Sequence, residues 1–280
     1  MNQKGNKMAV ISMARNAPHF VSKWISYYGS QFGFEHLYLF LDGLEQPLPE
    51  NADRIHCFQI PHKPLSRTRG DKERAKKIST FAHTLFEKYD GVIALDIDEF
   101  LVVDPKVNIT LHDYLVNQKQ HPSLSALGVD VIQHPKNEKQ INWGKPVLSQ
   151  RSYALLSDRY TKPIVAFQPV QWGAGFHRIK GEDFTIDSHL YLFHLGAADL
   201  SLTEKKLHDQ EMVKEGWKGH LKRRAKSVQQ IQLLDPQGED HMKQAKHYFS
   251  KNRKWYAWNK PAPLKINTLI EIPKRFKTVL

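Results

Sequence analysis

The stretch "GVIALDIDEFLV", from Gly91 to Val102, places three acids directly after an apolar run. Asp96, Asp98 and Glu99 fall within four positions, and more apolar residues follow them. Carboxylates repel one another, and it is costly to remove them from water. In an extended segment Asp96 and Asp98 would point the same way, and together they could hold one divalent cation, since Mg²⁺ and Mn²⁺ prefer oxygen ligands. The alternative is a surface turn with solvated acids, because a bare D-x-D motif recurs by chance.

Expected strands and helices alternate in the residues before this stretch. Apolar runs predict strands over residues 8–12, 36–42, 54–60 and 91–96, and helical periodicity predicts helices over 18–32 and 71–89. Pro18 suits the first turn of the earlier helix, and Gly33 suits its end. This order predicts an α/β fold with an open, mainly parallel sheet flanked by helices. Ligands bind such sheets at the carboxyl ends of the strands, where the three acids lie.

The second half of the chain has weaker periodicity. Further strands are expected over residues 125–132, 163–167 and 190–195. The stretch "SLTE", Ser201 to Glu204, has the pattern of a capping box and opens a charged helical region. A basic, aromatic tail follows that region. We therefore expect one domain over residues 1–200 and a helical, basic C-terminal extension over 201–280, packed on or flanking it.

Composition and charge narrow the choice of partners. The 280 residues are 40% hydrophobic and carry a net charge of +12, which predicts a globular protein with an excess of basic groups. Such an excess suits nucleic acid, an anionic membrane face or an acidic substrate, or is only a solvated surface. Cys57 is the one cysteine, so neither an internal disulfide nor a cysteine metal cluster is possible. The sequence has neither a signal-peptide pattern nor a long apolar run. The expected location is therefore the cytoplasm, and peripheral contact with the inner face of the membrane is compatible with it.

A resemblance to a known family joins these motifs. The segment "ARNAPHFVSKWISYYGSQFGFEHLYLFLD", residues 14–42, followed by "GVIALDIDEFLV", resembles the family-2-type glycosyltransferases with a GT-A (Rossmann-like) fold. It is similar to the bacterial branch that begins "ARNE" and carries "D-x-D-E-F". The similarity covers residues 8–103, and Ala17 departs from it, since relatives have Glu at that place.

The resemblance implies a donor and a metal. It implies a donor-binding half over residues 8–103 that holds a nucleotide-diphosphate sugar, with Arg15 and Asn16 beside the nucleotide. Asp42 would bind the base or ribose, although "DG" at this position is also a turn signal. Asp96 would contact ribose or metal-bound water, and Asp98 would bind Mn²⁺ or Mg²⁺ between the two phosphates.

The later motifs carry the remaining roles. Residues 104–200 would form the acceptor half, and "LYLFHL" offers His194 as a second metal ligand, while His177 of "GAGFHRI" is an alternative that contacts phosphate. A lone His on an apolar strand is also often a core residue. An inverting transfer needs a general base, and "GEDF" offers Asp183, with Glu182, Asp187 and Asp199 as the other possibilities.

The same residues are compatible with two functions other than glycosyl transfer to a glycan, acidic polysaccharide or lipid-linked acceptor. A metal-dependent phosphoryl-group enzyme could use the same acids, and the basic aromatic tail could bind nucleic acid or an anionic membrane. The acids at a strand end would repel nucleic-acid phosphates, so we expect no nucleic-acid partner. The sequence has neither a P-loop nor a G-x-G-x-x-G motif.

Overall fold

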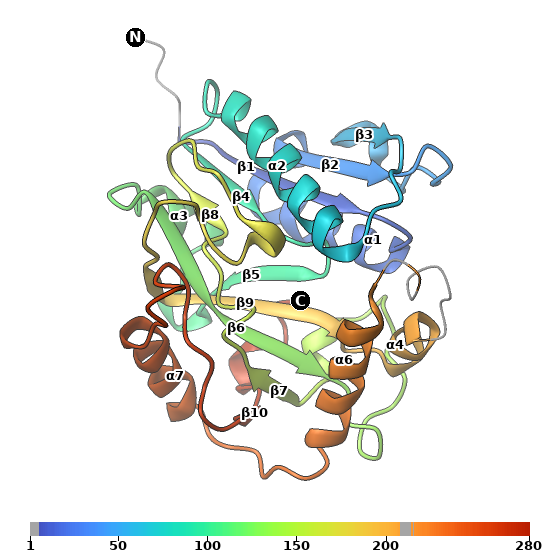
Figure 1. Cartoon of the computed structure of the whole chain (residues 1–280), viewed down its shortest axis with the longest axis vertical. Coiled ribbons are helices and arrows are strands. Elements are labelled where there is room, and N and C mark those ends of the chain that lie inside the picture. Colours follow the sequence, from blue (N-terminus) through green and yellow to red (C-terminus); the bar gives the residue numbers. More distant parts are fainter. Residues whose placement is uncertain (1–5, 208–213, 215) are drawn as a thin grey trace.

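The computed structural model describes residues 6–207, 214 and 216–280, and shows an α/β fold with an open, mixed sheet flanked by helices (Figure 1). The strands are β1 (Met8–Ala14), β2 (Leu37–Asp42), β3 (His56–Ile60), β4 (Gly91–Ala94), β5 (Glu99–Val103), β6 (Ser123–Ile132), β7 (Tyr153–Leu156), β8 (Val165–Ala166), β9 (Ile186–Ala197) and β10 (Leu269–Glu271). The α-helices of the described residues are α1 (Pro18–Phe32), α2 (Arg67–Leu85), α3 (Leu111–Val116), α4 (Leu200–Leu207), α6 (Lys218–Gln230) and α7 (Asp240–Lys251).

The N-terminal half is the parallel part of the sheet. Strands lie in the order β4-β1-β2-β3, and each neighbouring pair is parallel. Successive side chains of β1 point to opposite faces. Val10 packs in the core that contains Trp24 of α1, whereas Ala9 packs in the core that contains Ile78 of α2. The two helices therefore cover opposite faces, which explains why these strands are apolar throughout.

Most of the expected elements are present, with shifted ends. Helix α1 begins at Pro18 and is capped by Gly33 at φ 94°, as the sequence predicts. Helix α2 begins at Arg67, one turn before the predicted start. Its first turn is supported by Asp71, which lies 3.7 Å from Arg67 and 3.3 Å from Arg74.

The D-x-D motif lies in a turn that directly follows the end of β4, and not in an extended segment. Strand β4 ends at Ala94, and the amide of Glu99 donates to the carbonyl of Asp96 at 3.0 Å. The buried hydroxyl of Ser12 on β1 donates to the carbonyl of Leu95 at 2.9 Å and ties the turn to the sheet. The prediction that Asp96 and Asp98 lie in an extended segment and point the same way is therefore wrong, because a reversal between β4 and β5 separates their directions.

The C-terminal half makes the sheet mixed. Strand β8 is antiparallel to β4 and β6, and β9 lies between β5, to which it is antiparallel, and β6, to which it is parallel. Strands β7 and β10 complete the antiparallel edge. This insertion of β9 beside β5 brings His194 opposite Glu99 in register.

The described part of residues 201–280 packs on the rest of the structure. Helices α4, α6 and α7 are followed by β10, which joins the sheet beside β7 (Figure 1). Phe276 is fully buried, with its ring centroid 5.2 Å from those of Tyr191 and Phe193. The last residues of the chain are therefore part of the core. Among the described helices, none has both the length and the apolar character needed to cross a membrane.

Candidate functional site

Two cavities lie side by side around the D-x-D turn. The smaller, which we call the motif cavity, has a volume of about 370 Å³ and is lined by Asp96, Asp98, Arg15, Asn16, Lys206 and others. The larger, which we call the basic cavity, has a volume of about 680 Å³. Arg159, Tyr160, His177 and Arg224 line both cavities, so the two adjoin. The motif cavity lies at the carboxyl ends of parallel strands β1 and β4, as the sequence predicts for a ligand site.

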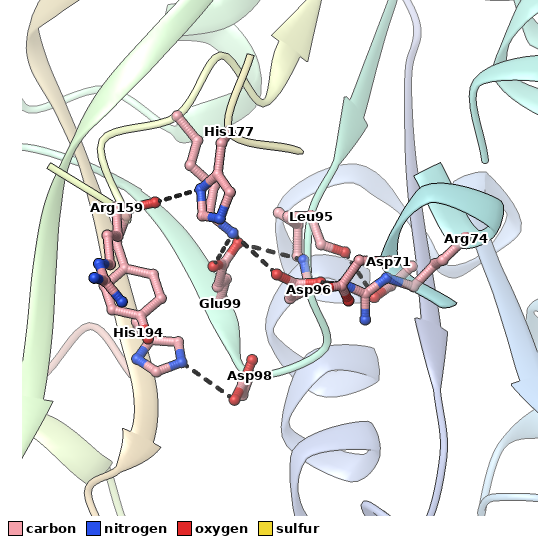
Figure 2. Close-up of polar contacts among 12 residues, drawn as sticks. Asp71, Arg74, Leu95, Asp96, Asp98, Glu99, Arg159, His177 and His194 are labelled. Atoms are coloured by element: carbon pink, nitrogen blue, oxygen red, sulfur yellow. Dashed lines mark hydrogen bonds and ion pairs between the residues drawn. The ribbon is translucent and has the colours of Figure 1, made fainter. Parts of the chain in front are cut away.

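Asp96 and Glu99 are paired with cations of the chain itself (Figure 2). Burial still outweighs this pairing at Glu99 and raises its pKa to about 7. Lys162, from the segment between β7 and β8, donates to Glu99 Oε1 at 2.5 Å and to Asp96 Oδ2 at 2.9 Å. Arg74 of α2 lies 3.0 Å from the other oxygen of Asp96. Glu99 and Lys162 are almost fully buried. This network answers how the chain tolerates clustered acids, because buried carboxylates need paired cations.

The pKa directions within this network follow from burial and pairing. Burial alone would raise the pKa of Asp96, but Arg74 and Lys162 outweigh it and lower that pKa. Burial would likewise lower the pKa of Lys162, and Asp96 and Glu99 raise it instead. Asp96 therefore stays ionised and Lys162 stays charged at neutral pH.

Asp98 faces a different set of residues. Its Oδ2 lies 3.3 Å from Nε2 of His194 on β9, and the other nitrogen, Nδ1, lies 2.6 Å from Oδ1 of Asp130 on β6. The ring of Tyr160 stacks on the imidazole with 3.8 Å between centroids. Burial would lower the pKa of His194, but Asp98 and Asp130 raise it to about 9. For Asp98, burial is outweighed chiefly by His194, which lowers the pKa of the carboxyl.

Arg224 reaches this group from α6. Its Nη2 lies 3.3 Å from His194 Nε2 and 3.3 Å from the hydroxyl of Tyr160. Gly196 allows the approach, because a Cβ there would collide with the Arg224 guanidinium and lie 2.8 Å from Asp98 Oδ2. Within the described chain Arg224 Nη1 is buried and has no hydrogen-bond partner. A buried, unpaired donor that points at this cluster is a place for an anionic ligand group.

Asp98 and His194 fit the donor set of a divalent cation that displaces the proton held by the His194 imidazole at neutral pH. Two ligands that each lie about 2.1 Å from one ion are separated by roughly 3 Å, and the observed separation is 3.3 Å. Asp130 occupies the outer nitrogen of the imidazole, as carboxylates do behind metal-bound histidines. The described residues hold no cluster of three or more His, Cys, Asp or Glu with metal-site geometry. A cation here would therefore take its remaining ligands from water or phosphate, as Mg²⁺ commonly does.

The residues that are predicted to bind the nucleotide divide into two groups. Arg15 and Asn16 line the motif cavity, with Asn16 at φ 50°, a conformation that Asn tolerates. Asp42 is not among the lining residues: its carboxylate lies 3.0 Å from Nδ1 of His62, and its carbonyl accepts from Arg15 at 2.6 Å. Asp42 thus positions Arg15 through its backbone, and its predicted contact with base or ribose stays a prediction.

Asp183, the predicted general base, lies outside both cavities. Its side chain is 61% exposed and pairs with Arg253 at 3.2 Å. Its position therefore gives the predicted catalytic role no support. The other candidates, Glu182, Asp187 and Asp199, also line neither cavity. Asp187 accepts from the Tyr114 hydroxyl at 2.8 Å, and Asp199 accepts from the amide of Ser201 at 2.9 Å. A two-residue motif such as "ED" does not predict which cavity its side chains will face.

His177 lines both cavities and is partly buried. Its Nδ1 lies 2.9 Å from the carbonyl of Arg159, and burial followed by the charge of Lys162 lowers its pKa to about 3. The imidazole is therefore neutral, and the structure records no direct contact between it and Asp98 among the described residues. Asp130, Tyr160, Lys162 and Arg224 were missed by sequence reasoning, since each sits outside any motif and its only signal was residue type.

Comparison with known proteins does not identify this site. No protein-family model matches the chain, and a search of curated proteins found no match.

Proposed function

We propose that this chain is a divalent-metal-dependent glycosyltransferase with a GT-A-like fold that takes its sugar from a nucleotide-diphosphate sugar. The observation that carries the proposal is the Asp98–His194–Asp130 chain beside a cavity at the carboxyl ends of β1 and β4. A carboxylate and a carboxylate-held imidazole, 3.3 Å apart, suit one Mn²⁺ or Mg²⁺ ion. The resemblance of residues 8–103 to family-2-type glycosyltransferases supports the same assignment.

The residues of the motif cavity have distinct tasks in this proposal. Asp98 and His194 hold the cation, which supplies Lewis-acid stabilisation of the leaving diphosphate. Arg15, Lys206 and Arg224 line the same cavity and present positive charge to the phosphates. Asp96, fixed by Lys162 and Arg74, presents its remaining lone pairs toward ribose or metal-bound water.

Transfer with inversion requires a group that takes the proton of the acceptor hydroxyl. Asp130 and Asp158 are the acids that line the basic cavity. Asp130 already accepts from His194, so we assign the base to Asp158, whose pKa is raised by burial. A raised pKa makes a carboxylate a better proton acceptor.

The test is calorimetry with UDP, GDP, CDP, ADP and dTDP, each with and without Mn²⁺. We expect at least one of these to bind in a Mn²⁺-dependent way. Asp98→Asn should weaken that binding roughly 100-fold, because an amide is a poor ligand for a hard cation. Asp240→Asn, at an exposed position of α7, is the matched control and should bind as the parent does.

Two results would contradict the proposal. One is the lack of binding of all five diphosphates by a parent protein that is folded. The other is equal Mn²⁺-dependent affinity in Asp98→Asn and the parent. Release of inorganic phosphate from a bound nucleotide, without transfer of sugar, would favour the alternative of a phosphoryl-group enzyme.

A further inference from the structure

The basic cavity has an excess of cationic side chains. Those that line it are Arg159, Arg223, Arg224, Lys226, Lys254 and Lys260. They face two acids, Asp130 and Asp158, and Asp130 is already engaged by His194. Clustered like charges raise the electrostatic energy of a cavity wall, and a bound anion lowers it.

Arg223 and Lys226 are two examples of this excess of positive charge. Both project from α6, and in the part of the chain that the structure describes neither forms an ion pair with a carboxylate. The pKa of Arg223 is lowered by burial and by the nearby charges of Arg159 and Arg67. Its positive charge thus lies among cations and next to an open volume, which is the environment of an anion-binding group.

The cavity also has an aromatic wall and a bounded size. Tyr256 lines it, with 61% of its surface exposed, and Lys254 lies 5.7 Å from the centre of that ring. An aromatic face of this kind packs against the apolar face of a small ligand. The volume of about 680 Å³ falls within the roughly 300–1,000 Å³ of small-ligand sites. A nucleic-acid surface would instead follow an extended backbone groove with several stacking residues.

We propose that the basic cavity binds the acceptor, and that this acceptor is an anionic saccharide bearing carboxylate or phosphate groups. The role as acceptor rests on the proposed function, because it follows from the border with the motif cavity at Arg159, Tyr160 and Arg224. The preference for an anion rests on the cavity alone. Arg223, Lys226 and Lys254 bind the charged groups, and Tyr256 packs on a sugar ring.

The experiment measures binding of three hexasaccharides to the full chain: hexagalacturonate, maltohexaose with a terminal phosphate, and unmodified maltohexaose. We expect the parent to bind one or both of the charged saccharides and to bind the neutral one weakly. Comparison of the two charged saccharides identifies whether carboxylate or phosphate is the recognised group. Binding should weaken as salt rises from about 0.05 to 0.5 M, because salt screens these charges.

A pair of double variants assigns the binding to the cavity. Arg223→Gln/Lys226→Gln should weaken binding of the charged saccharide about 10- to 30-fold, since two contacts with an anion are lost. The control, Lys222→Gln/Lys251→Gln, removes the same charge from exposed positions outside the cavity and should stay within about twofold of the parent. Mn²⁺-dependent binding of the nucleoside diphosphate should be the same in both variants, which also shows that both are folded.

Three outcomes would overturn the proposal. The first is equal binding of neutral and charged hexasaccharides by the parent. The second is an equal loss of binding in the cavity variant and the control. The third is binding of phosphatidylglycerol vesicles, lost in the cavity variant, by a parent that binds none of the saccharides; this would assign the surface to a membrane. If the charged saccharide binds as expected but no nucleoside diphosphate does, the acceptor role fails together with the proposed function, while the anion preference of the cavity is upheld.

Discussion

Asp96 and Asp98 are separated by one residue, yet the fold gives them opposite surroundings. Asp96 has Lys162, from the segment between β7 and β8, at 2.9 Å and Arg74 of α2 at 3.0 Å; Figure 2 labels Asp96 and Arg74. Asp98 has an imidazole at 3.3 Å, although both carboxylates line the motif cavity. The turn between β4 and β5 separates the two, because it directs one carboxylate toward α2 and the other toward β9.

The difference separates a carboxylate that mainly stabilises the fold, Asp96, from one that is arranged to bind a ligand, Asp98. A carboxylate with two chain cations has its charge already balanced, so its pairs contribute to the folded structure. A carboxylate whose neighbour is a histidine held by a further carboxylate is arranged as a metal ligand is. We therefore expect substitutions on the Asp96 side to act mainly on stability and those on the Asp98 side mainly on binding.

The largest effect is expected at Lys162, on the Asp96 side. Lys162→Met leaves buried Glu99 without its cation, and it should lower the free energy of unfolding by about 3–5 kcal/mol. Urea denaturation measures this loss. Glu99→Gln in the same chain should recover part of it, because an amide is neutral without taking up a proton, whereas burial raises the pKa of Glu99 to about 7 and the loss of Lys162 raises it further.

Lys119→Met is the matched control for Lys162→Met. Lys119 pairs with Asp90 at 3.1 Å near the surface, where the loss of an ion pair changes stability by at most about 1 kcal/mol. Equal losses of stability in the two variants would remove the distinction between the buried network and an ordinary surface pair.

The second-largest effect is expected at Asp158, an acid that lines the basic cavity. Asp158→Asn should lower sugar transfer about 10²- to 10⁴-fold with little change in donor affinity, because a general base acts in the transition state. Asp183→Asn, outside both cavities, should transfer at nearly the parental rate. Single-turnover kinetics with a donor and acceptor identified as above measures both. The reverse result would return the role to Asp183.

The smallest effect is expected at Asp130, which contacts Nδ1 of the His194 imidazole. Asp130→Asn keeps an acceptor for His194 Nδ1 but removes its charge, so Mn²⁺ affinity should fall about 10- to 100-fold. Titration with Mn²⁺ in the presence of the nucleoside diphosphate measures this change. Asp113→Asn is the control, since Asp113 lies 3.1 Å from Nδ1 of His112 at an exposed site. An unchanged Mn²⁺ affinity in Asp130→Asn would place His194 outside the metal site.

The sequence determined the parts of this structure that depend on local patterns. Apolar runs and helical periodicity are set by near neighbours, so they predicted β1, β2, α1 and the α/β class. The same patterns placed Arg15, Asn16, Asp96 and Asp98 at the carboxyl ends of strands, and these four residues line the motif cavity. Strand β5 was missed because its apolar residues follow the acids directly and resemble the end of β4.

Only the tertiary structure decided how the acids are paired. Lys162 is 66 positions from Asp96, and Arg224 is 30 positions beyond His194, so no local period connects them. Their encounter depends on β9 lying between β5 and β6, and on α6 packing over Gly196. For the same reason the sequence indicates Asp183, which lies outside both cavities, and does not indicate Asp130, which lines the basic cavity. Charge and residue type can be read along the chain, but an ion pair is a contact across space, and the topology of the sheet sets which side chains meet.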